Sequence, residues 1–192
     1  FYKGSHNSNI ISDISTSRIR QFGGTSNVWG GWCKPLNKLD YDSWNFDHEE
    51  LKKFENDTCK ILNIKNSFRE SKIDKNYNQI EFQYSEVKFA EKYNDHIKQS
   101  KNIIIFLNTQ LSHFVGSNGK ILFAKCINNK VEIDLKAKHF VLCCGGIENS
   151  RIMLWTRENN KNLLSKDLPL GKFWMVHYWT LAGVGLLDKE KF

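Results

Sequence analysis

The chain has little proline, no C-x-x-C pair and no long apolar run. Two prolines among 192 residues exclude a proline-rich linker. No apolar stretch approaches the roughly 18 residues of a membrane-spanning helix, so no membrane span is predicted. The five cysteines are odd in number and form no cluster with ligand spacing, which argues against a disulfide framework and against a zinc site. We therefore expect free thiols, no bound metal and a reducing compartment, with the cytoplasm favoured.

A long basic run is also missing, although the formal net charge is +7. The excess Lys and Arg residues are spread singly along the chain, and no cluster of about five to eight basic residues occurs. Two interpretations remain open, a solvated basic surface and a polyanion-binding face. The scattered pattern favours the first, so we expect no nucleic-acid partner.

What the sequence does contain is a dense glycine segment. Residues 22–36 read Phe-Gly-Gly-Thr-Ser-Asn-Val-Trp-Gly-Gly-Trp-Cys-Lys-Pro-Leu. Glycine costs about 0.5–1 kcal/mol of backbone entropy relative to alanine, so such a cluster marks a required backbone conformation. The glycine pairs bracket short polar side chains and a tryptophan, which suits a backbone lying against a planar, polar ligand. The alternative is a glycine-rich turn packed by its own tryptophans.

A second segment combines a strand pattern, two glycines and a helix pattern. Residues 139–144 predict a buried strand, Gly145 and Gly146 a turn, and residues 147–155 a helix. Free backbone N–H groups at the start of such a helix bind phosphate in open α/β sheets. The two segments together indicate a dinucleotide site. In the first turn of the helix, Glu148 and Asn149 are predicted either to cap the helix or to join a cofactor or structural network. Arg151 is predicted to form an ion pair with Glu148 or to reach a phosphate, and the ion pair is favoured.

These segments resemble the glucose–methanol–choline oxidoreductases, most of all their sugar- and glucoside-oxidising branch. Residues 22–36 resemble the family's second flavin-contacting segment, and residues 141–154 its later strand–glycine–helix signature. Residues 170–177 resemble an element that leads into the substrate domain, in which His177 is not the proton acceptor. The resemblance implies an α/β fold, namely an FAD-binding Rossmann-like domain with a β-meander.

The resemblance also implies residue roles. The implied cofactor-binding residues are Gly23, Gly24, Thr25, Ser26, Asn27, Trp29, Gly30, Gly31, Leu111, Cys144, Gly145 and Gly146. Valine occupies position 28, where some sugar oxidases of the family carry a histidine linked to the flavin, so FAD is expected to be bound non-covalently. The implied reaction is hydride transfer from an alcohol or sugar hydroxyl to flavin N5, with an unknown electron acceptor. The alternative is a non-catalytic remnant or binding module that retains part of the flavoprotein fold.

Two parts of the family pattern are missing. The sequence contains no Gly-x-Gly-x-x-Gly turn, since Gly183-Val184-Gly185 lacks the third glycine, and the family's catalytic histidine is expected beyond Phe192. We therefore expect an internal piece of a longer protein, incomplete at both ends and inactive alone, with no catalytic residue in this chain. Residues 1–170 are predicted to belong to the FAD-binding domain, with a helical insertion at about 45–100, and residues 171–192 to begin the substrate domain.

Local patterns complete the prediction. A helix is expected from about Asn45, with Asp47 and Glu50 as a capping box, and its apolar side carrying Leu51, Phe54, Thr58, Ile61 and Leu62. Residues 63–84 read as an irregular loop and residues 85–99 as a second helix. Residues 103–107 predict a strand buried on both faces. A three-stranded meander is expected over 111–115, 121–127 and 131–135, with a turn at 116–119.

Overall fold

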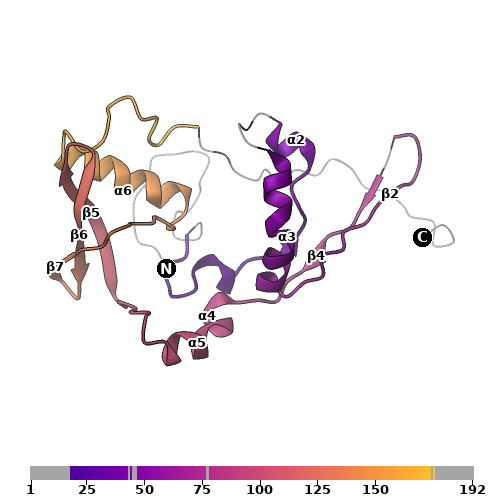
Figure 1. Ribbon diagram of the computed structural model, residues 1–192, viewed down its shortest axis with the longest axis horizontal. Coiled ribbons are helices and arrows are strands. Elements are labelled where there is room, and N and C mark those ends of the chain that lie inside the picture. Colours follow the sequence, from indigo (N-terminus) through magenta and orange to yellow (C-terminus); the bar gives the residue numbers. More distant parts are fainter. Residues whose placement is uncertain (1–17, 43, 45–46, 77, 174, 176–192) are drawn as a thin grey trace. The chain divides into compact units, whose positions relative to one another are not determined.

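The computed structural model describes residues 18–42, 44, 47–76, 78–173 and 175. These residues form a mixed α/β protein with small antiparallel sheets, so the expected fold class is confirmed at this coarse level. The chain divides into two compact units, Phe1–Ile105 and Phe106–Phe192. Figure 1 shows the elements of each unit. The expectations that concern residues 1–17 and the stretch from His177 to Gly185 lie outside the described residues.

The longest element of the first unit is the helix α3 (His48–Leu62). The Asp47 carboxylate precedes it and accepts a hydrogen bond from Glu49 N at 3.0 Å, as an N-cap residue does. The helix ends at Asn63, whose φ of 55° is left-handed. The predicted helix and its cap at Asp47 are confirmed.

Short elements make up the rest of this unit. They are η1 (Gly24–Asn27), β1 (Trp32–Cys33), α2 (Lys38–Tyr41), β2 (Glu70–Lys72), β3 (Asn78–Ile80), β4 (Gln83–Tyr84), α4 (Phe89–Lys92) and α5 (Asn94–Gln99). β1 pairs with β4 and β2 with β3, both antiparallel. The prediction of an irregular loop over 63–84 is therefore wrong in part. β2 and β3 are exposed along their whole length, and so they lack the alternation that identifies a half-buried strand.

The predicted helix over 85–99 is also wrong at its beginning. Ser85 N donates to Gly31 O at 2.8 Å, and Val87 O accepts from the indole of Trp29 at 3.0 Å. These long-range bonds hold the chain extended as far as Lys88, so helical structure begins only at Phe89. Tyr93 then separates α4 from α5.

The second unit contains the three-stranded antiparallel sheet that the sequence predicted. Its strands are β5 (Thr109–Ser117), β6 (Lys120–Asn128) and β7 (Val131–Leu135), in the order β5-β6-β7. Two-residue turns with positive φ join them: Asn118 and Gly119 have φ of 51° and 74°, and Asn129 and Lys130 have 47° and 72°. Two positive φ angles are the mark of a type I′ turn, which matches the twist of a hairpin. The predicted meander is confirmed.

A β-bulge adjusts which side chains of β5 face the core. Leu111 is opposite Cys126 and His113 is opposite Lys125, so Ser112 is an extra residue. This insertion shifts the alternation, and both Leu111 and Phe114 pack in the core although they are three residues apart.

The helix α6 (Gly146–Asn159) packs against this sheet (Figure 1). The buried core consists of Phe114, Ala124, Cys126, Ile152 and Leu163. Thr156 is 0% exposed, and its Oγ1 accepts a hydrogen bond from Phe114 N at 3.0 Å. The predicted helix is confirmed and is longer than expected.

Two predicted strands are absent. Residues 103–107 and 139–144 have no strand structure, and Ile104 and Val141 are 78% and 82% exposed. A strand requires a hydrogen-bonded neighbour, and neither segment has one among the described residues. Phe140 nevertheless packs on the core, with its ring centroid 5.3 Å from that of Phe114.

No helix in the described part of the chain is both long and apolar enough to cross a membrane.

Candidate functional site

The glycine segment begins with a tight turn that only glycine fits. Gly23 has a φ of 89°, and a Cβ added there would lie 2.7 Å from the Cβ of Ala90. Gly24 has a φ of 57° and opens the 3-10 helix η1. Gly23 is therefore required both by its backbone conformation and by the close approach of α4.

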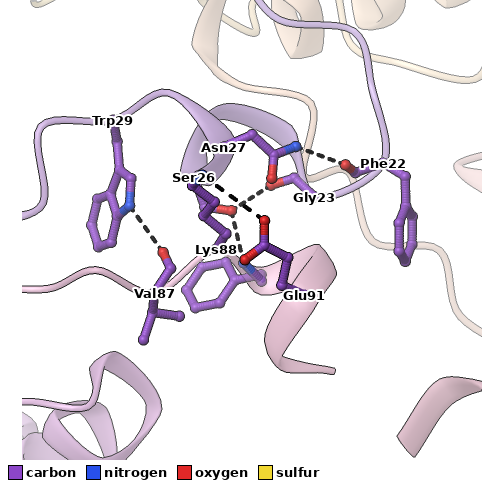
Figure 2. Close-up of polar contacts among 9 residues, drawn as sticks. Phe22, Gly23, Ser26, Asn27, Trp29, Val87, Lys88 and Glu91 are labelled. Atoms are coloured by element: carbon purple, nitrogen blue, oxygen red, sulfur yellow. Dashed lines mark hydrogen bonds and ion pairs between the residues drawn. The ribbon is translucent and has the colours of Figure 1, made fainter. Parts of the chain in front are cut away.

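The side chain of Ser26 holds this turn to α4. Ser26 is 7% exposed; its hydroxyl donates to Gly23 O at 2.7 Å and accepts from Phe89 N at 3.1 Å. Figure 2 shows Ser26, Gly23 and their neighbours. A serine hydroxyl has a single donor. That donor is used within the fold, so the Ser26 side chain is not free to donate to a cofactor.

The other polar residues of the turn differ in exposure. Asn27 Nδ2 donates to Phe22 O at 2.8 Å and closes the turn (Figure 2). Thr25 is exposed, and Val28 is 62% exposed. Thr25 and Val28 therefore face solvent, and Val28 carries no nucleophilic atom for a covalent flavin link.

Trp29 and Gly31 fix the chain that leaves the turn. The indole Nε1 of Trp29 donates to Val87 O at 3.0 Å, and its ring lies 6.4 Å from that of Phe89 between centroids. Gly31 has a φ of 70°, and a Cβ there would lie 2.3 Å from Ser85 O. Gly30 is exposed. The sequence left open a turn that is packed by its own tryptophans. Trp29 does have a packing role, but its contacts are with Val87 and Phe89.

The second glycine pair opens the helix α6. Gly145 precedes the helix with φ 82° and ψ 161°, a conformation that is essentially restricted to glycine. No side chain caps the helix, and a Cβ added at Gly145 or Gly146 would meet nothing within 4 Å. The backbone at this helix start can therefore be approached closely by a ligand.

The chain leading to these glycines is held in place from the helix. Asn149 Oδ1 accepts from Cys144 N at 3.0 Å, and Asn149 Nδ2 donates to Leu142 O at 3.2 Å. Arg151 Nε donates to Glu148 Oε1 at 2.9 Å, so the predicted ion pair is confirmed. The sequence left Asn149 open between capping and a cofactor or structural network, and these two hydrogen bonds favour the structural-network role, since no side chain caps the helix.

Leu111 lies on β5 immediately before the bulge. Its Cα is paired with that of Cys126, and its side chain packs against the core. Residues 23–31 lie in the first unit, whereas Leu111 and residues 144–146 lie in the second. The predicted site residues are thus divided between the two units.

The described cysteines are free thiols, and several are held in the protonated form. Loss of hydration raises the pKa of Cys144, and the carboxylate of Glu148 adds to this effect. Desolvation likewise raises the pKa of Cys33 and of Cys59. Such thiols are poor nucleophiles. Within the described ranges no three His, Cys, Asp or Glu side chains are grouped to hold a metal ion.

A cavity that the sequence did not predict lies along α3 in the first unit. Its volume is about 240 Å³, and its lining is mostly apolar, with Leu51, Leu62 and Phe68 among the residues. The ionisable groups that α3 contributes to the lining are His48, Glu55 and Cys59. Of the positions predicted for the apolar side of the helix, Phe54 and Ile61 instead face solvent, at 62% and 44% exposed. Apolar residues lie on two overlapping faces of α3, and their spacing alone did not show which face is buried.

Comparisons of the chain with models of known protein families, with characterised proteins and with solved structures give no match.

Proposed function

We propose that this chain forms part of the FAD-binding domain of an oxidoreductase that acts on CH–OH groups. The implied relatives are the glucose–methanol–choline enzymes, and the substrate is an alcohol or a sugar. The proposal rests on three sequence segments that resemble those of the family and occur in the same order along the chain. One structural observation adds support.

That observation is the open start of α6. The 14-residue helix has no side-chain cap, and an added Cβ at Gly145 or Gly146 would meet nothing within 4 Å. The helix dipole and the first N–H groups of the helix favour an anion, and a dinucleotide pyrophosphate is an anion of the right size. Asn149 adds to this by fixing the chain that enters the turn.

The unpaired segments 103–107 and 139–143 support the proposed Rossmann-like sheet. Residues 103–107 are apolar, contain three isoleucines and are exposed. In residues 139–143 Val141 is exposed, whereas Phe140 and Leu142 pack against the core. An exposed apolar strand edge invites pairing, so natural proteins cover or pair such edges. We propose that both segments are strands of a parallel sheet in the complete domain, whose phosphate site lies at the carboxyl end of the second strand.

By the resemblance, the turn at residues 23–31 would be a further cofactor-binding segment. Thr25 is exposed on this turn, while the hydrogen bonds of Ser26 and Trp29 hold the turn to residues 87–89. When bound, the flavin would accept hydride at N5. This chain would bind and orient the cofactor, and we place no proton-transferring residue in it.

The proposal is tested on the protein expressed from its complete reading frame. The purified protein should show the absorption bands of oxidised flavin, and acid precipitation should release FAD into the supernatant because Val28 forms no covalent link. Anaerobic addition of sugars and simple alcohols should then bleach the flavin bands. Purified, folded protein without flavin, and without affinity for added FAD, would overturn the proposal and favour the non-catalytic alternative.

A further inference from the structure

Trp32, within the glycine segment, and Tyr84 of β4 form an exposed aromatic pair in the first unit. Trp32 is 69% exposed and Tyr84 is 55% exposed. Their ring centroids lie 5.5 Å apart at an interplanar angle of 61°, an edge-to-face pair. Large aromatic side chains that are grouped and exposed mark a surface used for binding.

The backbone holds this pair in a fixed position. Trp32 and Tyr84 are direct partners in the β1–β4 ladder, and the neighbouring Ser85 is 2% exposed. Ser85 Oγ donates to Leu62 O at 2.6 Å, which anchors the ladder to the end of α3. A Cβ on Gly31 would lie 2.9 Å from Cε2 of Tyr84, so the glycine makes room for the tyrosine ring. The aromatic pair is therefore pre-formed.

Trp29 and Trp32 differ in how their indoles are used. The Nε1 of Trp29 is satisfied by Val87 O. The Nε1 of Trp32 has no hydrogen-bond partner among the described residues, and its ring is largely open to solvent. The Trp32 indole therefore offers both an apolar face and a donor at its edge.

A sugar ring fits this combination. The axial C–H groups of a pyranose form an apolar face that packs on an aromatic ring, and its hydroxyl oxygens accept hydrogen bonds at the ring edge. Trp32 follows the proposed flavin-lining residues by one position, so a sugar stacked on it would lie next to the cofactor segment along the chain.

We infer that Trp32 is a substrate-positioning residue which stacks on the sugar ring, with Tyr84 supporting its indole. The inference deepens the proposed function and rests on it. Stacking holds the sugar ring without taking part in hydride transfer, so it acts through substrate binding.

The test compares Trp32→Ala with Trp155→Ala, which removes a half-exposed tryptophan from α6 in the second unit. Saturation-transfer NMR with methyl glucoside as the probe should show transfer to the sugar in the unchanged 192-residue chain and in Trp155→Ala. The signal should fall at least several-fold in Trp32→Ala. Tyr84→Phe retains the ring and should retain the signal. Circular dichroism checks that each variant is folded.

A second readout uses the flavin-loaded protein from the complete reading frame. Trp32→Ala should raise KM for the sugar about tenfold or more and change kcat much less, as expected for lost ground-state binding. If flavin reduction by sugar proceeds with an unchanged KM, the inference is wrong while the proposed function stands. If no flavin binds, the proposed function fails, and the NMR comparison decides the role of Trp32 by itself. Equal NMR signals in all the variants would overturn the inference.

Discussion

Asn160 closes the free edge of β5 by bonding to Phe114. Its Nδ2 donates to Phe114 O at 2.8 Å, and its Oδ1 accepts from Gly116 N at 3.3 Å. The carboxamide thus donates to the C=O of one residue and accepts from the N–H of the residue two positions later, as the backbone of a neighbouring strand would. Asn149 does the same for Leu142 and Cys144 at the other end of α6. The helix thus satisfies extended backbone that would otherwise be open to pairing with another chain.

Replacing Asn160 with leucine should destabilise the second unit. The change leaves Phe114 O and Gly116 N without their side-chain partner, and a lost partner of a buried polar group costs about 1–3 kcal/mol. Asn159→Leu is the matched control, since Asn159 is exposed and bonds only to Trp155 O in its own helix. Urea unfolding followed by circular dichroism measures both. Equal midpoints for the two variants would contradict the role assigned to Asn160.

Gly31→Ala should cost more stability than Gly119→Ala. The two glycines have nearly equal φ angles, 70° and 74°, so alanine pays a similar left-handed penalty of about 1–2 kcal/mol at each. Only at Gly31 would the new Cβ meet backbone, at 2.3 Å from Ser85 O, whereas Gly119 faces open space. Forced overpacking typically adds about 1–3 kcal/mol. The difference between the two unfolding free energies measures the clash of the new Cβ with Ser85 O. No difference would mean that Gly31 and Ser85 do not approach so closely.

The elements that the sequence predicted well are those defined by local chemistry. The Asp47 cap, the turn at Asn118 and Gly119, and the helix after Gly145 each depend on a few adjacent residues. The prediction failed where a distant partner decides the structure. Ser85 begins no helix because Gly31 holds it extended, and the apolar segments 103–107 and 139–144 form no strand without a neighbour.

The candidate site shows the same division. The need for glycine at Gly23 and Gly145 could be read from the sequence, because a cluster of glycines marks unusual φ angles. The inward bonds of Ser26 could not, since they depend on which element lies opposite. For Asn149 the sequence left capping and a network role open, because its partners Leu142 and Cys144 lie outside the helix.

The stability of the second unit should fall as the pH is lowered through the range in which histidine titrates. Desolvation lowers the pKa of His113, and the ammonium of Lys125 across the sheet lowers it further, although Glu132 acts in the opposite direction. A histidine whose folded pKa lies below its unfolded value of about 6.5 binds its proton more readily when unfolded. The contribution of neutral His113 to the free energy of unfolding is therefore complete above about pH 6.5, and it is lost as the pH falls through the folded pKa.

An NMR titration of the His113 ring checks this directly. Lys125→Met should raise the pKa of His113 part of the way toward its ordinary value, because the desolvation remains. His96→Gln is the control, since His96 lies in α5 of the first unit and should leave the titration of His113 unchanged. A pKa of His113 at or above 6.5 in the unchanged protein would contradict the assignment.

The most direct test of the central claim is the affinity for FAD of the protein from the complete reading frame with Gly146→Val. Gly146 has open space around an added Cβ and its φ is not left-handed, so valine should leave the free energy of unfolding nearly unchanged. The added side chain would nevertheless cover the first N–H groups of α6, where the pyrophosphate is proposed to bind. We predict a Kd for FAD at least tenfold above that of the unchanged protein, with Gly119→Ala unaffected. Equal affinities in the unchanged and Gly146→Val proteins, or no FAD binding in either, would contradict the account.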